Sequence, residues 1–190
     1  IVELHKVTYT SVDVNNKRVN LTGLVAVPVG GAPKGLVVYC HGTTVDRGRS
    51  PSKYKGKGEA PETVEAIAAF AGGGYAVVLP DYLGLGDHKG AHPYPFAKIN
   101  AASGRDIISA ARSFAKQKNY KIGRELFITG YSEGGAVAMA LTQLLQSYMN
   151  EQYQVTKSAP LSGPYDLSGV TRNFILTDTN EQVGFVLRLY

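Results

Sequence analysis

The sequence has too few cysteines for a disulfide and no apolar run long enough for a membrane span. Cys40 is the single cysteine among 190 residues, which excludes an internal disulfide. No stretch approaches the roughly 20 apolar residues of a transmembrane helix, and no charged-then-apolar leader opens the chain. Since 44% of the residues are hydrophobic, we expect one soluble domain with a single sizeable core.

Stacking aromatic side chains are scarce where the chain is most basic. The net charge is +5, and five of the cations fall close together: Arg47, Arg49, Lys53, Lys55 and Lys57. Nucleic-acid sites combine such cations with several aromatics on a structured face, whereas Tyr54 is alone here. The pattern therefore predicts no nucleic-acid partner and favours a solvated, mobile loop. A basic lip that attracts anionic surfaces or substrates is the alternative.

The sequence also lacks a regular metal-binding or nucleotide-binding motif. Asp81, Asp87, His88 and His92 lie in a loop rich in Pro and Gly, without regular ligand spacing. We expect the two aspartates to brace turns by bonding nearby backbone, with a metal site as the alternative. Gly72–Gly74 comes after a helical pattern and before a strand, the reverse of a dinucleotide loop. No metal and no cofactor are predicted.

Strand patterns alternate with helical patterns along the chain. Val2–Val14 and Arg18–Val27 predict an antiparallel hairpin, since the Asn pair between them favours a turn. Buried strands are predicted at 35–40, 75–79, 126–129 and 155–159, and helices at 61–70, 98–116 and 136–148. This alternation predicts an α/β fold, with a mostly parallel sheet, helices on both faces and the hairpin at one edge.

A G-x-S-x-G match runs from Gly130 to Gly134, between a predicted strand and a predicted helix. A strand that turns abruptly into a helix places the middle residue at the apex of a strained bend. Glycines two residues before and after that residue avoid a steric collision. The motif therefore predicts that Ser132 is a nucleophile. An ordinary helix N-cap serine is the alternative.

The ends of the parallel strands predict a shared rim. Thr43, Asp81, Ser132 and Leu161 each fall just past a predicted strand, where ligands bind in such sheets. A nucleophilic serine needs backbone N–H groups directed at the oxygen that becomes negative. We expect these N–H groups from Thr43 and Glu133, with Gly42 allowing a close approach. The side chain of Glu133 is expected to be incidental, either solvated or paired.

Four stretches carry a wider resemblance: GYSEGG at 130–135, HGTT at 41–44, PDYLGLGD at 80–87 and APLSGPYDLS at 159–168. Together they resemble the secretory lipase (lipase A-like) esterases of the α/β-hydrolase superfamily, over nearly the whole chain from Leu21 onward. The resemblance implies an extracellular or periplasmic enzyme that hydrolyses small-molecule or lipid esters through an acyl-enzyme, without a cofactor. It also implies a hydrolase core at 1–165 and the start of a helical cap at 166–190.

The resemblance assigns roles to particular residues. It implies that Ser132 is the nucleophile and that Thr43 and Glu133 form the oxyanion hole. The supporting residues that it implies are His41, Gly42, Asp81, Tyr82, Gly130 and Gly134.

The sequence departs from this family because no histidine follows Ser132. Family members have the acid and then the histidine after the serine, whereas the histidines here are His5, His41, His88 and His92. We hypothesise that the acid, the base and the last strands lie beyond the 190 residues, downstream or on another chain. His41 is the alternative base, because triads tolerate different chain orders. Its expected role is otherwise to hold the oxyanion loop.

Three other functions stay open at this point. A peptidase or an acyltransferase of the same superfamily would share the serine and differ in cap residues. A non-catalytic binding protein would keep the rim and lack the triad.

Overall fold

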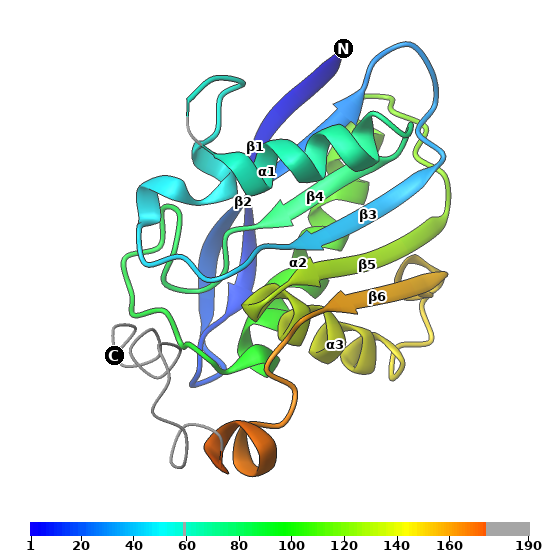
Figure 1. The fold of residues 1–190 in the computed structure, drawn as a ribbon. Helices are drawn as coiled ribbons and strands as arrows, with labels where there is room; N and C mark the ends of the chain where they lie inside the picture. The colour runs from blue at the N-terminus through cyan, green and yellow to red at the C-terminus, as the bar shows by residue number, and fades with distance from the viewer. Residues whose placement is uncertain (59, 174–190) are drawn as a thin grey trace.

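The computed structural model describes residues 1–58 and 60–173, in which a six-stranded sheet carries helices on both faces (Figure 1). The strands are β1 (Val2–Val12), β2 (Arg18–Pro28), β3 (Gly35–Cys40), β4 (Ala76–Pro80), β5 (Glu125–Tyr131) and β6 (Lys157–Leu161). The helices are α1 (Pro61–Ala66), continued by a π-helical turn at Ile67–Ala71, α2 (Ala97–Gln117) and α3 (Glu133–Leu145). The predicted α/β fold is confirmed.

The N-terminal hairpin forms one edge of the sheet. β1 and β2 pair antiparallel over their whole lengths, from Val2 opposite Pro28 to Val12 opposite Arg18. The carboxylate of Asp13 accepts hydrogen bonds from two amides of the turn. Asn16 takes a positive φ of 60°, which asparagine tolerates better than most residues. The hairpin and its edge position are as predicted.

The strand order β1-β2-β4-β3-β5-β6 decides which face each helix covers. β4, β3, β5 and β6 are mutually parallel. The step from β3 to β4 runs toward the hairpin, and the next two steps run toward the other edge. Because such crossovers are right-handed, opposite steps place their helices on opposite faces. α1 therefore packs on one face, and α2 and α3 pack on the other. The direction reverses at β3, so a crevice is expected beyond the ends of β3 and β5.

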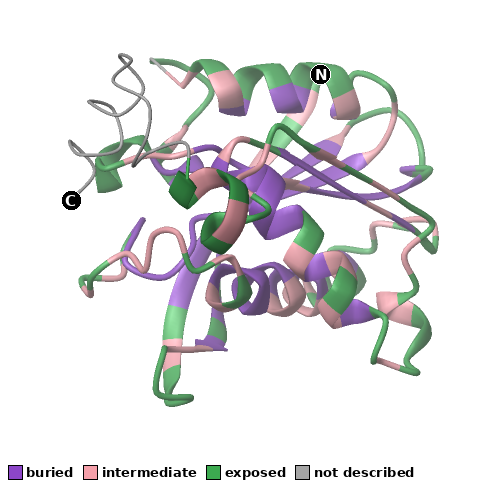
Figure 2. Cartoon of the chain, turned by 60° about the horizontal axis from the view of Figure 1, so that its bottom comes forward, coloured by how far each residue is buried: buried purple, intermediate pink, exposed green. Residues whose placement is uncertain are grey.

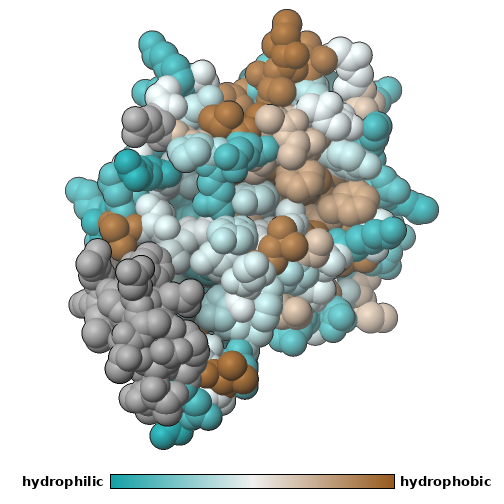
Figure 3. All heavy atoms as spheres, viewed as in Figure 1, coloured by the Kyte–Doolittle hydropathy of each residue, from teal (hydrophilic) through white to brown (hydrophobic). Residues whose placement is uncertain are grey.

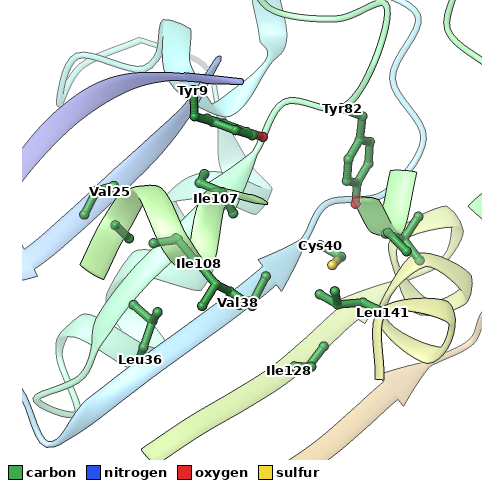
Figure 4. Close-up of a cluster of buried hydrophobic side chains, with 14 of the residues drawn as sticks. Tyr9, Val25, Leu36, Val38, Cys40, Tyr82, Ile107, Ile108, Ile128 and Leu141 are labelled. Atoms are coloured by element: carbon green, nitrogen blue, oxygen red, sulfur yellow. The ribbon is translucent and has the colours of Figure 1, made fainter. Parts of the chain in front are cut away.

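Alternate residues of each central strand point to opposite sides of the sheet. Leu36 and Val38 of β3 join the cluster under α2 and α3, whereas Val37 joins the cluster under α1. Buried positions accordingly line the strands and the inner helix sides, and exposed positions line the outer helix sides (Figure 2). Cys40 lies in the larger cluster, near Tyr82 and Leu141 (Figure 4). Burial raises the pKa of its thiol to about 12, so Cys40 is not a thiolate nucleophile near neutral pH.

Two elements beside Ser132 differ from their predicted bounds. α3 begins at Glu133, directly after the serine, whereas the pattern predicted a start at Ala136. β6 extends to Leu161, so two residues predicted as loop belong to a strand. The cause is tertiary, because Leu161 pairs with Tyr131 and its carbonyl accepts the amide of Ser132 at 3.0 Å. A local pattern does not contain that pairing.

The basic stretch at 47–57 is more structured than the predicted solvated loop. It contains two 3₁₀ turns, Arg47–Arg49 and Pro51–Lys53, and Ser50 and Ser52 are buried. The guanidinium of Arg47 donates to backbone carbonyls between Gly84 and Gly90. Hydrophilic side chains gather over this stretch, beside α1 in the view of Figure 1 (Figure 3). The charged tips are exposed as predicted, but the backbone between them is anchored.

The predicted cap at 166–190 is described only at its start. Asp166 caps a helical turn at Leu167–Thr171 by accepting the amides of Gly169 and Val170. These bonds lower the pKa of the Asp166 carboxyl. Residues 174–190, with most of the apolar side chains expected in the cap, lie outside the described residues, so the cap stays a prediction. Within the described ranges, no helix is both long and apolar enough to cross a membrane.

Candidate functional site

Ser132 occupies a strained turn between β5 and α3. Its backbone has φ 56° and ψ −122°, a combination that L-residues with a side chain rarely adopt. Its position is formally the N-cap of α3, yet its side chain makes no capping hydrogen bond. The carbonyl of Ser132 instead accepts the amides of Gly135 and Ala136. The ordinary N-cap role considered for this serine is therefore wrong, because its hydroxyl does not bond the first amides of the helix.

Three glycines make this turn sterically possible. A Cβ on Gly130 would lie 2.5 Å from the carbonyl oxygen of Cys40, and a Cβ on Gly134 would lie 1.9 Å from the same atom. These distances are far shorter than any real Cβ contact, and the neighbour is rigid backbone. A Cβ on Gly135, a residue that was not among the predicted site residues, would lie 2.2 Å from the carbonyl oxygen of Leu161. The tandem Gly-Gly in the motif was the available signal.

Two backbone amides near Ser132 have no partner among the described residues. They belong to Glu133, the first residue of α3, and to Thr43, in the loop after β3. The two segments are in contact, since Gly42 lies beside the carbonyl of Tyr131. An added Cβ at Gly42 would be 3.4 Å from that oxygen, which is an ordinary contact. That Gly42 allows a close approach therefore stays a prediction. Its amide donates to Glu62 at 2.8 Å.

His41 and Tyr82 support the loop that carries Thr43. The His41 ring is buried and stacks on Tyr82, with the ring centroids 4.2 Å apart. Its Nδ1 lies 2.7 Å from the Gly42 carbonyl, and its Nε2 lies 3.3 Å from the Asp81 carbonyl. The Tyr82 hydroxyl donates to the His41 carbonyl at 3.0 Å. Both ring nitrogens of His41 face backbone oxygens, which agrees with the supporting role rather than with a base.

The Glu133 side chain is buried and paired, so one of its two expected states is observed. Its Oε1 accepts from Nε2 of His92 at 2.7 Å and from Nδ2 of Asn100 at 3.2 Å. Nδ1 of His92 contacts the carbonyl of Leu83 at 2.8 Å. Burial by itself lowers the pKa of His92, but the bond to Glu133, its charge and the Leu83 carbonyl outweigh burial and raise that pKa. With both nitrogens engaged, His92 cannot accept a proton from Ser132.

We expect the His92–Glu133 pair to give a pH-dependent contribution to stability. A raised histidine pKa means that the contribution is fully present below the ordinary value of 6.5 and is lost as the pH rises through the raised pKa. Histidine NMR titration should place His92 above its ordinary pKa, and Glu133→Gln should lower it. A His92 that titrates at or below the ordinary value in the unaltered protein would contradict the pairing.

Asp81 and Asp87 stabilise contacts between distant segments, not the local turns that were predicted. The buried carboxylate of Asp81 accepts from the Thr22 hydroxyl at 2.5 Å and from the Ser52 amide at 2.8 Å. Asp87 pairs with Lys53 and Lys6, which lower the pKa of its carboxyl to about 2. Within the part of the chain that the structure describes, no three potential ligands gather as a metal site.

The loop at 41–44 separates two cavities. The larger, about 690 Å³, is lined by the loop, by Arg49 and Pro51 and by the start of α1, including Glu62. The smaller, about 210 Å³, contains Thr43, Arg47, His92 and Tyr94. Thr43 lines both cavities, so a molecule bound at this rim would contact this residue.

No protein-family model matches the chain, and no curated protein does either. Solved structures do match. A Legionella pneumophila protein described as an inferred hydrolase is 32% identical over 93% of this chain, with a TM-score of 0.82. The rice cell wall degrading esterase LipA of Xanthomonas oryzae is 28% identical over 92% of this chain, with a TM-score of 0.76. Candida antarctica lipase A in its closed state is 18% identical over 82%, with a TM-score of 0.58, and supports the fold alone.

The chain spans less than half the length of these proteins: 46% of the Legionella protein, 45% of LipA and 36% of the Candida lipase. The matches confirm the α/β-hydrolase fold, and the neighbours include an esterase and a lipase.

Proposed function

We propose that this chain carries the nucleophile and the oxyanion hole of a serine hydrolase that cleaves carboxylic esters. The single observation that carries the proposal is the turn at Ser132: a strained serine between strand and helix that does not cap its helix, near two amides that have no partner in the described part of the chain. This arrangement has the form of a nucleophile elbow. The esterase among the structural neighbours supports the same reaction class.

In the proposed mechanism the Ser132 hydroxyl attacks the ester carbonyl carbon and gives its proton to a histidine base. The carbonyl oxygen becomes negative and accepts hydrogen bonds from the amides of Thr43 and Glu133, each worth roughly 3 kcal/mol of barrier. The ester C–O bond then breaks, and the alcohol leaves with the proton from the histidine. Water, deprotonated by the same base, attacks the acyl-enzyme, releases the acid and restores Ser132.

We place the base and its carboxylate outside these 190 residues, in a further segment or a second chain. The ring nitrogens of His41 face the carbonyls of Gly42 and Asp81, and those of His92 face the Leu83 carbonyl and the Glu133 carboxylate. His88 accepts two backbone amides through Nδ1, and His5 lies on β1 beside Glu3 and Tyr120. The greater length of the structural neighbours is compatible with a missing contribution.

Covalent labelling tests the proposal. A fluorophosphonate should modify the complete enzyme at one residue, and peptide mass spectrometry should locate the adduct on Ser132. A panel of ester, amide and acyl-acceptor substrates then separates an esterase from a peptidase or an acyltransferase. A complete protein that shows neither labelling nor turnover would instead be a binding protein that retains only the rim.

His41→Gln separates a supporting role from a base. Because His41 contacts loop carbonyls, we expect the variant to keep measurable ester turnover, within about a hundredfold of the unaltered enzyme. Removal of a true base would cost roughly 10⁴-fold or more. The measurement is kcat in the complete enzyme, with folding checked by circular dichroism. Turnover that falls to background in a folded His41→Gln variant would restore His41 as the base.

A further inference from the structure

Helix α1 contacts the loop that carries Thr43 through one carboxylate. Glu62, the second residue of the helix, accepts two hydrogen bonds at Oε1: one from the amide of Gly42 at 2.8 Å and one from the hydroxyl of Tyr39 at 3.0 Å. Burial, and then the charge of Glu62, raise the pKa of Tyr39, so the phenol stays protonated as a donor. No local sequence signal predicts this contact, because it spans twenty residues and two elements.

The contact fixes one peptide plane of the loop at both of its ends. The carbonyl of His41 and the amide of Gly42 belong to the same planar peptide group. The carbonyl accepts from the Tyr82 hydroxyl at 3.0 Å, and the amide donates to Glu62. Tyr82 comes from the segment after β4, whereas Glu62 comes from α1. The two partners therefore hold this peptide plane from different parts of the fold.

The next peptide plane is fixed at one end only. It contains the carbonyl of Gly42 and the amide of Thr43, which point in opposite directions in a trans peptide. Nδ1 of His41 lies 2.7 Å from that carbonyl and must donate, because a carbonyl oxygen can only accept. The amide of Thr43 is thereby directed away from His41 and has no partner among the described residues.

We propose that Glu62 is a positioning residue of the oxyanion hole, which fixes the His41–Gly42 peptide so that the Thr43 amide is held toward the substrate oxygen. This inference rests on the proposed esterase function. An oxyanion donor contributes only when it is already aligned with the developing charge. Loss of the Glu62 contact would free the first peptide plane to rotate and would misdirect the second.

The test compares four forms of the complete enzyme: unaltered, Glu62→Ala, Glu62→Gln and Glu151→Ala. Glu62→Ala should lower kcat about tenfold to a hundredfold with little change in KM, and should weaken a boronic-acid transition-state analogue by a similar factor. Glu62→Gln keeps a carbonyl oxygen that can accept both donors, so its kcat should lie within about threefold of the unaltered enzyme. Glu151 is the control, since it is an exposed carboxylate at the start of the turn Glu151–Tyr153, and its variant should behave as the unaltered enzyme.

Each outcome decides the inference. A folded Glu62→Ala variant with unchanged kcat and analogue affinity would overturn it, and so would a Gln variant as impaired as the Ala variant. If Glu62→Ala does not fold, Glu62→Asp replaces it, because the shorter side chain withdraws the carboxylate and should lower kcat while KM holds. If Ser132 is labelled in the unaltered enzyme but the Glu62 variants keep kcat and analogue affinity, this inference is wrong and the proposed function stands. Absence of labelling and turnover in the unaltered enzyme defeats the proposed function and this inference together.

Discussion

Ser132→Ala in the complete enzyme lowers kcat for ester hydrolysis by about 10⁵-fold or more and removes the fluorophosphonate adduct. The nucleophile and its base act as a unit, so the loss of the hydroxyl leaves only substrate binding and the oxyanion hole. Residual catalysis of roughly 10³ to 10⁴-fold over water should remain. The measurement is single-turnover hydrolysis of an activated ester, with the acyl-enzyme followed by intact-protein mass spectrometry.

The matched control for this substitution is Ser162→Ala. Ser162 also has a positive φ, 50°, and follows the neighbouring strand β6, but it lies outside the G-x-S-x-G turn and is exposed. We expect its variant to keep turnover and labelling. If Ser162→Ala abolished activity while Ser132→Ala retained it, the nucleophile would have to be reassigned.

Gly134→Ala is expected to destabilise the fold by about 3 kcal/mol or more. Alanine favours a helix over glycine by about 1 kcal/mol, which would stabilise α3 if nothing else changed. The added Cβ, however, would lie 1.9 Å from the carbonyl oxygen of Cys40 and 2.6 Å from that of His41. Both are backbone atoms of β3 and its loop, so either the strand or the helix must move. The steric cost therefore exceeds the gain in helix propensity.

Thermal unfolding followed by circular dichroism measures this effect. For a chain of this size, a loss of about 3 kcal/mol should lower Tm by roughly 6 to 12 °C. Gly31→Ala is the matched control, because a Cβ there meets nothing within 4 Å. Its Tm should change little, since surface substitutions usually stay within about 0.5 kcal/mol. If the Gly134→Ala variant has the same Tm as the control, then α3 and β3 can move apart without a loss in the free energy of unfolding, and the prediction is wrong.

The sequence predicted the elements and the ends of the sheet well because their signals are local. The run 35–40 predicted β3 at its observed bounds, and the Asn15–Asn16 turn predicted the hairpin. The motif around Ser132 predicted a tight turn, and its glycines are required by the contacts of β3. α3 begins earlier and β6 ends later than predicted, because the amide of Ser132 donates to the carbonyl of Leu161 on the neighbouring strand.

The roles of the acidic side chains could not be predicted from local sequence. Asp81 bonds Thr22 and Ser52, and Asp87 pairs with Lys6 and Lys53, although nearby backbone partners were expected for both. The contact of Glu62 with the loop was not predicted. An acidic residue in the first turn of a helix is usually explained by its favourable interaction with the helix dipole alone. These contacts join residues that are distant in the chain, and pairing across such distances depends on how the elements pack.

By itself, the sequence determined the fold class, the strained turn at Ser132 and the lack of a histidine after it, because periodicity, glycine placement and chain order can be read directly. Only the tertiary structure decided that His41 and His92 are engaged at both ring nitrogens and that the amides of Thr43 and Glu133 are left without partners in the described chain. Which atoms these imidazoles and amides bond depends on how the strands and helices pack. Their orientations are therefore set only when the sheet brings its strand ends together.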